Sequence, residues 1–129
     1  MNIIDSSVLV KFFLKEPGWE NVKEHIINSV GIELNIKELY NAIWKKNIMK
    51  QIILSKEILK DLSEIDQVIT IVDQRKYMNI ALEVAVANKI TVYDSLFIAI
   101  AKAQNYRLVT CDVKQAEIAK KLDVKVILC

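Results

Sequence analysis

Four acidic residues in this sequence stand where predicted strands give way to helices or where a predicted helix begins: Asp5, Glu38, Asp94 and Asp112. Taken singly, each acid is explained by helix capping and by the helix dipole, which both favour carboxylates at helix N-termini. In a parallel α/β sheet, the strand ends that lead into helices all lie along one edge, where such folds bind their ligands. Taken together, the four carboxylates are therefore expected to converge on a common pocket.

Converging carboxylates need a positive charge between them, because two like unit charges about 4 Å apart repel by about 4 kcal/mol at an effective dielectric of about 20. All the candidate ligands are hard oxygens, with no thiolate or imidazole among them, and such a set favours Mg²⁺ or Mn²⁺ over zinc. Mg²⁺ in proteins is bound by a few carboxylates together with a substrate phosphate. The acids therefore predict phosphate-ester chemistry in which the metal activates a water.

The elements that would position these acids alternate between strand and helix along the chain. Apolar runs predict strands that end at Asp5 or span Ile32–Ile36, Thr70–Val72, Arg107–Thr110 and Val124–Leu128. Helical periods predict helices after Asp5, over Pro17–Val30, from Ile36 with Glu38 in the first turn, over Ser55–Ile69, Tyr77–Ala85 and Ile90–Ala103, and up to Leu122. This alternation predicts an α/β fold in which helices cover both faces of a parallel sheet of about five strands. With no linker or repeat, residues 1–129 are expected to form a single domain.

Composition restricts the other classes of function. The net charge of +2 permits a nucleic-acid partner without arguing for one. The two cysteines make neither a disulfide framework nor a zinc motif, and they suit a reducing cytoplasm. No signal peptide is evident, and no run approaches the roughly 18 apolar residues of a membrane helix, so we expect no membrane association.

Four segments resemble the motifs of PIN-domain proteins: IIDSSVLVKFF at the start, KELYNAIWK around Glu38, YDSLFIAIAKAQNYRLVTCD, and the closing strand. The resemblance covers essentially the whole chain and is greatest to the small VapC-type toxins of toxin–antitoxin pairs. It implies a three-layer α/β/α PIN-like fold and an endoribonuclease that depends on Mg²⁺ or Mn²⁺. Carried over by position, it gives the catalytic and metal-binding role to Asp5, Glu38, Asp94 and Asp112. It also implies that Ser7 and Thr110 orient ligands or waters.

The resemblance further implies three partners, namely an RNA substrate, a VapB-like antitoxin and a second copy of the chain. Exposed aromatic residues on the early helices, with Phe13, Trp19 and Trp44 as candidates, are expected to bury themselves in such contacts. Residues 49–75 carry no family motif, so RNA selectivity and antitoxin contacts are expected to vary there. RNA phosphates are expected to contact cations near the acids, chiefly Lys11, Lys45 and Lys46, with Lys50 and Arg107 as further candidates.

Three alternatives compete with a PIN-type ribonuclease. A phosphatase of the haloacid dehalogenase type needs a second aspartate two residues after the first, and Ser7 occupies that position. A phospho-receiver domain needs paired acids near the first strand, and they are absent. A non-catalytic PIN-like module that binds RNA or protein stays open, although a pocket without a metal would gain nothing from four like charges.

Overall fold

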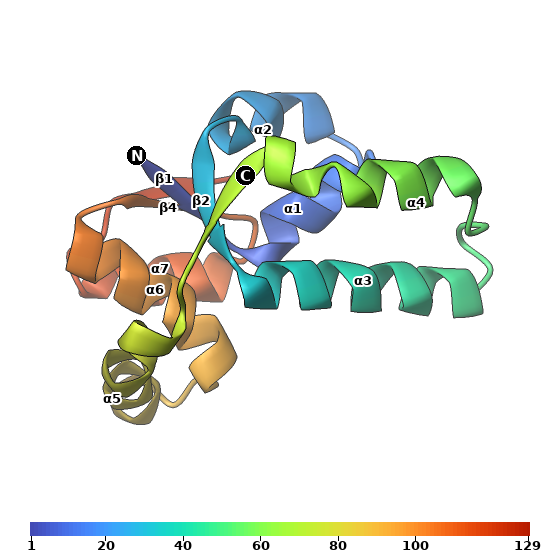
Figure 1. Cartoon of the computed structure of the whole chain (residues 1–129). Helices are drawn as coiled ribbons and strands as arrows, with labels where there is room; N and C mark the ends of the chain where they lie inside the picture. Colours follow the sequence, from blue (N-terminus) through green and yellow to red (C-terminus); the bar gives the residue numbers. More distant parts are fainter.

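The structure is a computed structural model that describes residues 1–129, and a five-stranded parallel sheet lies at its centre (Figure 1). The strands are β1 (Asn2–Ile4), β2 (Ser29–Ile32), β3 (Ile69–Val72), β4 (Arg107–Thr110) and β5 (Val126–Leu128). Their order across the sheet is β3-β2-β1-β4-β5, and every neighbouring pair is parallel. β1 is therefore the central strand, and all five carboxyl ends lie along one edge.

Helices cover both faces of this sheet. They are α1 (Ser6–Phe13), α2 (Trp19–Ile26), α3 (Glu33–Ile48), α4 (Lys56–Ser63), α5 (Met78–Asn88), α6 (Val92–Gln104) and α7 (Val113–Lys121). Two short 3-10 helices, Ile65–Gln67 and Arg75–Tyr77, flank β3. In Figure 1, α3 extends beyond the sheet to the right and the chain returns through α4.

Alternation along the strands divides the buried side chains into two cores. Ile3 and Leu108 point to the core that contains α5, α6 and part of α7, whereas Ile4 and Val109 point to the core that α1 to α4 enclose. Such alternation is the period of two that places successive strand residues on opposite faces. α6 is buried along most of its length, as its apolar sequence requires. The predicted three-layer α/β/α fold is confirmed.

One strand prediction was wrong, and it displaces the following helix. The second strand is Ser29–Ile32 rather than Ile32–Ile36, and α3 begins at Glu33. Gly31 lies inside this strand, and β3 leaves no room for a larger residue there, since a Cβ would approach the Cδ1 of Ile69 to 3.0 Å. Glu38 is consequently the sixth residue of α3 and does not lie in its first turn.

Two helix ends also differ from the prediction. α2 ends at Ile26, because Asn28 takes a positive φ of 64° and turns the chain into β2. α4 ends at Ser63, although Ser55 caps its first turn as expected by accepting a hydrogen bond from the Ile58 N–H. The short strand expected near residues 70–72 is confirmed as β3.

No helix is by itself both long and apolar enough to span a membrane. The segments Arg75–Asn88 and Val92–Gln104 reach that length and apolarity only as a pair, and the chain bends by 115° between them.

Candidate active site at the carboxyl edge of the sheet

Asp5 is the most deeply buried acid of the predicted site. β1 ends at Ile4, and the Asp5 N–H still bonds the Val109 carbonyl at 3.1 Å, which holds Asp5 beside the end of β4. Its carboxylate then caps α1 by accepting from the Val8 N–H at 3.2 Å. Only 3% of the residue is exposed, and this burial raises the pKa of its carboxyl above the ordinary 3.8.

Hydroxyl groups satisfy the rest of the Asp5 carboxylate. Ser7 Oγ donates to Asp5 Oδ1 at 2.6 Å, and the Thr110 hydroxyl donates to Oδ2. Thr110 Oγ1 in turn accepts from the Asp112 N–H at 3.0 Å, and Ser7 Oγ accepts from the Cys111 N–H at 3.1 Å. The turns that follow β1 and β4 are therefore joined by a continuous chain of hydrogen bonds. Ser7 and Thr110 thus both donate to the Asp5 carboxylate.

Asp112 begins α7 and lies next to two other acids. Its carboxylate caps the helix by accepting from the N–H groups of Lys114 at 2.9 Å and Gln115 at 3.2 Å. The negative charge of Asp112 also raises the pKa of Asp5 and of Asp94, in each case after the larger effect of burial. Carboxylates from three different elements therefore act on one another at this edge.

Asp94 lies at the start of a helix, as the sequence predicted. It is in the first turn of α6, after the turn from α5, and its N–H donates to Thr91 Oγ1 at 3.2 Å. Gln115 Nε2 donates to the Asp94 carbonyl at 2.9 Å and so ties α7 to α6. Lys114 opposes the rise in the pKa of Asp94 through its positive charge.

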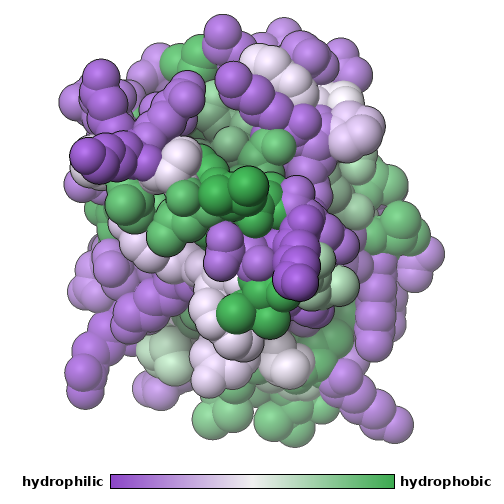
Figure 2. Space-filling view, turned by 90° about the vertical axis from the view of Figure 1, so that its right-hand side faces the viewer, coloured by the Kyte–Doolittle hydropathy of each residue, from purple (hydrophilic) through white to green (hydrophobic).

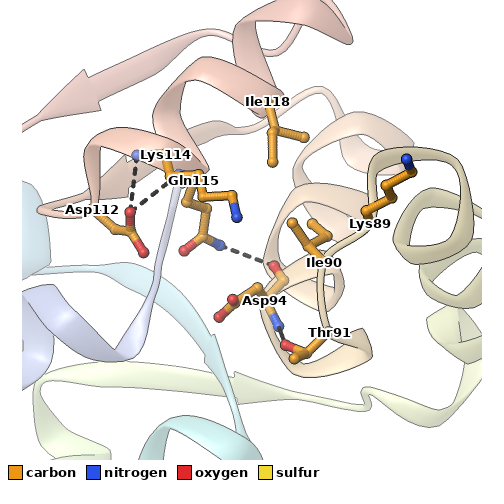
Figure 3. A pocket seen from close by; sticks show the side chains of 8 residues that line it. All are labelled: Lys89, Ile90, Thr91, Asp94, Asp112, Lys114, Gln115 and Ile118. Atoms are coloured by element: carbon orange, nitrogen blue, oxygen red, sulfur yellow. Dashed lines mark hydrogen bonds between the residues drawn. The ribbon is translucent and has the colours of Figure 1, made fainter.

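A pocket of about 280 Å³ opens between α6 and α7. Figure 3 shows the Asp94 and Asp112 side chains directed into it, with Lys114 reaching over it and Lys89 at its outer rim. The remaining lining residues are Ile90, Thr91, Gln115 and Ile118. The pocket thus combines acids that suit a metal ion with cations that suit a phosphate.

Glu38 is held beside Asp5 through Ser6. Ser6 Oγ donates to Glu38 Oε1 at 2.6 Å, which links the start of α1 to the second turn of α3. α3 is itself fixed by the fully buried Asn35, whose Nδ2 donates to the Ile4 carbonyl at 3.1 Å and whose Oδ1 accepts from the Ile32 N–H at 2.7 Å. The fourth acid therefore lies at the same edge, although α3 presents it from a helix interior.

Asp112 acts on both Asp5 and Asp94, and Glu38 is linked through Ser6 to the turn after β1, but the four acids do not close around one point. No three carboxylate, imidazole or thiol groups lie close enough together to ligate one ion directly. Their donor atoms are nevertheless all hard oxygens, and Mg²⁺ retains several waters through which carboxylates bind it. The donor set therefore fits a hydrated Mg²⁺ or Mn²⁺ and does not fit zinc.

The lysines predicted to contact RNA lie away from this pocket. Lys46 forms an ion pair with Glu16 at 3.2 Å, and Lys11 is half-buried beside Gly18. Lys45 is exposed on α3, seven residues beyond Glu38 and hence about 10 Å further along the same helix face. The cations that line the pocket, Lys89 and Lys114, were missed.

Sequence reasoning also missed Ser6, Asn35 and Gln115. Asn35 had a local signal, because an amide at the third helical position commonly bonds back to the residue before the helix. Ser6 and Gln115 act across elements that are distant in the sequence, and only the fold reveals their partners.

The fold and the acids at its carboxyl edge define a protein of the PIN class, and comparison with known families agrees. A family model described as PIN domain matches residues 3–121, so the chain belongs to the PIN-domain family, whose members are generally nucleases. The predicted resemblance to VapC-like PIN proteins is thereby confirmed at the level of the family.

Two solved structures share this fold. PAE2754 from Pyrobaculum aerophilum is 20% identical with a TM-score of 0.75, and the match covers 97% of this chain and 81% of that one. VapBC2 from Rickettsia felis, bound to a DNA fragment from their promoter, is 15% identical with a TM-score of 0.68, and the match covers 99% and 98% of the two chains. At these identities the likeness concerns the fold alone. No curated protein matches the chain.

Proposed function

We propose that the protein is a metal-dependent endoribonuclease and the toxin of a VapBC-type toxin–antitoxin pair. One observation carries the enzymatic part: Asp94 and Asp112 point into one pocket, and the Thr110 hydroxyl joins Asp5 to the Asp112 N–H beside it. A group of like charges of this kind costs stability unless a cation joins it. The proposal extends to one PIN domain that acts in the cytoplasm, where both free thiols suit a reducing environment.

In this proposal Asp5, Glu38, Asp94 and Asp112 hold Mg²⁺ or Mn²⁺, some of them through water. The metal, when bound, supplies an activated water and stabilises charge on the phosphate. Thr110 and Ser7 keep the Asp5 carboxylate oriented by donating to its two oxygens. Ser6 performs the same task for Glu38. The hydrogen-bonded turns thus fix the acids before any substrate arrives.

RNA would lie across the pocket with its phosphates against cations. Lys89 and Lys114 line the pocket and are the first candidates. Lys45, on the Glu38 face of α3, is a candidate for contact with a phosphate further along the RNA. Lys11 would contribute less because it is half-buried, and Lys46 would contribute less because it is paired with Glu16. These contacts would read the backbone and not the bases.

A VapB-like antitoxin and a second copy are the partners we propose for the apolar surfaces. A groove of about 230 Å³ runs between α1, α2 and the region after α4, where Phe12, Phe13, Trp19 and Val68 supply its apolar wall. Asp61 and Glu64 line the same groove against the single cation Lys15, so it suits an apolar segment that also carries a basic residue. Trp44, which is 60% exposed on α3, is a candidate anchor for the second copy.

The remaining alternative is a non-catalytic PIN-like module that binds RNA or protein. The raised pKa of Asp5 and Asp94 disfavours it, because a binding module would have no use for the destabilising charges.

Incubation of the purified protein with a mixed RNA pool tests the proposal. We expect cleavage with Mg²⁺ or Mn²⁺, none with a chelator, and none by Asp94→Asn with either ion. Asp66→Asn is the matched control, because Asp66 is an exposed acid on the 3-10 helix before β3 and should behave like the parent. RNA binding without cleavage by the parent in either metal would favour the non-catalytic module.

A further inference from the structure

The two cysteines of the chain lie side by side at the carboxyl edge of the sheet. Cys111 directly follows β4 and Cys129 directly follows β5, and Thr110 pairs with Leu128 in the parallel ladder between these strands. The Cys129 N–H continues the ladder by donating to the Thr110 carbonyl at 2.8 Å. The two residues therefore occupy matching positions one step beyond the last strand pair, and their side chains leave the same face of the sheet.

Their thiols lie side by side and are unpaired, and burial raises the pKa of the Cys129 thiol to about 12. The two side chains are close enough for Cys111 to act on the pKa of Cys129, both thiols are free, and both residues are half-buried against the core that α1 to α4 enclose. Neighbouring strands lie about 4.8 Å apart, which falls within the range of about 4.4 to 6.8 Å that disulfides span between Cα atoms. A disulfide can therefore form here with only a small displacement of the backbone.

We propose that Cys111 and Cys129 form a reversible intramolecular disulfide, and that this bond regulates the neighbouring carboxylate site. The oxidant in this reaction is a peroxide. One thiol attacks the peroxide, becomes a sulfenic acid and releases the first water, or an alcohol from an organic peroxide. The second thiol then attacks that sulfur, the S–S bond forms, and the second water leaves, so that two electrons pass from the thiols to the peroxide. A low-molecular-weight dithiol reverses the reaction by thiol–disulfide exchange.

The bond would act on the site through the backbone of Cys111. The Cys111 N–H donates to Ser7 Oγ at 3.1 Å, and Ser7 Oγ donates to Asp5 Oδ1 at 2.6 Å. Thr110, which precedes Cys111, also joins the two turns by donating to Asp5, and it accepts from the Asp112 N–H. Closing the S–S bond to about 2.05 Å draws Cys111 toward β5 and lengthens its bond to Ser7. This regulatory step rests on the proposed nuclease, whereas the disulfide itself does not.

Mass spectrometry of the intact protein tests the disulfide. After treatment with hydrogen peroxide we expect the monomer to lose two hydrogen atoms, both cysteines to stop reacting with a maleimide, and dithiothreitol to restore both thiols. Cys129→Ser is the matched control, because it keeps Cys111 in place and cannot lose the two hydrogens. Three outcomes would each overturn the proposal. They are two thiols that still react with maleimide, oxygen added to a cysteine without a disulfide, and a disulfide found only between two copies.

Amide hydrogen exchange and RNA cleavage test the regulatory step. We expect faster exchange of the Cys111 N–H and about tenfold less cleavage in the oxidised protein, both reversed by dithiothreitol. If the disulfide forms while exchange and cleavage stay unchanged, the coupling to Asp5 is wrong. If exchange increases but neither form cleaves RNA, the nuclease proposal fails and the redox pair stands.

Discussion

The carboxyl edge of the sheet and the arm of residues 40–63, which comprises the second half of α3 together with α4, are built in opposite ways. At the edge, polar side chains are buried and bonded to one another: Thr110 is 0% exposed and Asp5 3%. On the arm, large apolar side chains face solvent, among them Trp44 at 60% and Ile53 at 86%. α4 contributes only one fully buried side chain, Leu62. Figure 2 shows hydrophobic residues gathered on the end of the molecule that the arm forms.

This difference separates the two tasks that we propose for the protein. A buried and hydrogen-bonded acid such as Asp5 is held in position before a ligand binds, which is what a catalytic site requires. An exposed apolar surface gains free energy only when another surface covers it, which is what a partner supplies. The edge should therefore tolerate few substitutions without loss of activity, and the arm should tolerate many without loss of folding.

The largest effect is expected from Asp5→Asn. The substitution removes ligand charge at nearly constant volume, and several kcal/mol of lost charge stabilisation corresponds to about 1000-fold slower cleavage. RNA cleavage at saturating Mg²⁺ measures it. Glu57→Gln on α4 is the matched control from the arm and should cleave at the parental rate. Parental cleavage by Asp5→Asn would remove Asp5 from the site.

The same variant should be no less stable than the parent in metal-free buffer. Burial raises the pKa of Asp5 above 3.8 in the folded protein, so the charged carboxylate costs stability at neutral pH. Stability of the parent should rise as the pH falls through this raised pKa, whereas the variant, which stays neutral, should gain less. Urea unfolding at neutral and mildly acidic pH measures both. An equal gain in parent and variant would contradict the assignment.

A smaller effect is expected from Thr110→Val, which removes the hydroxyl between Asp5 and the Asp112 N–H. Loss of a group that orients a ligand typically lowers metal affinity by about 10- to 100-fold. Thr110→Ser keeps the hydroxyl and should retain most of the affinity in a calorimetric Mn²⁺ titration. If valine and serine behave alike, the hydroxyl does not orient the site.

Substitution of two pairs of lysines tests whether RNA lies across the edge or along the arm. Replacing Lys89 and Lys114 by Ala should weaken binding to all RNA sequences and flatten its dependence on salt by about two units of slope. Replacing Lys45 and Lys46 should flatten it by about one unit, because Lys46 already pairs with Glu16. Both are measured in the Asp5→Asn background to prevent cleavage. A larger effect from the arm pair would place the RNA along α3.

The smallest effect on the fold is expected from Trp44→Ser on the arm. Its exposed ring contributes little to folding, so stability should change by no more than about 0.5 kcal/mol. If the ring anchors a second copy, light scattering should show the parent as a dimer and the variant as a monomer. Trp19→Ala is the comparison, because Trp19 packs edge-on against Phe12 and should cost stability. A parent that is monomeric well above micromolar concentration would argue against the dimer.

The sequence predicted the fold and the edge residues where the signal was local. Asp5 and Asp112 each follow a short apolar strand and cap the next helix, so strand pattern and capping chemistry identified both. Glu38 was assigned to the wrong turn, because the buried Asn35 and the closely packed Gly31 fix the start of α3 through tertiary contacts. Lys89 and Lys114 were missed, because a shared pocket joins residues that are distant in the sequence.

A calorimetric titration of the RNA-free protein with Mn²⁺ tests the central claim that the acids at the edge form one metal site. The parent and Asp66→Asn should bind Mn²⁺ alike, and Asp94→Asn should lose at least about tenfold in affinity, since one ligand charge is gone. Equal binding by all three proteins, or no binding by the parent, would contradict the claim.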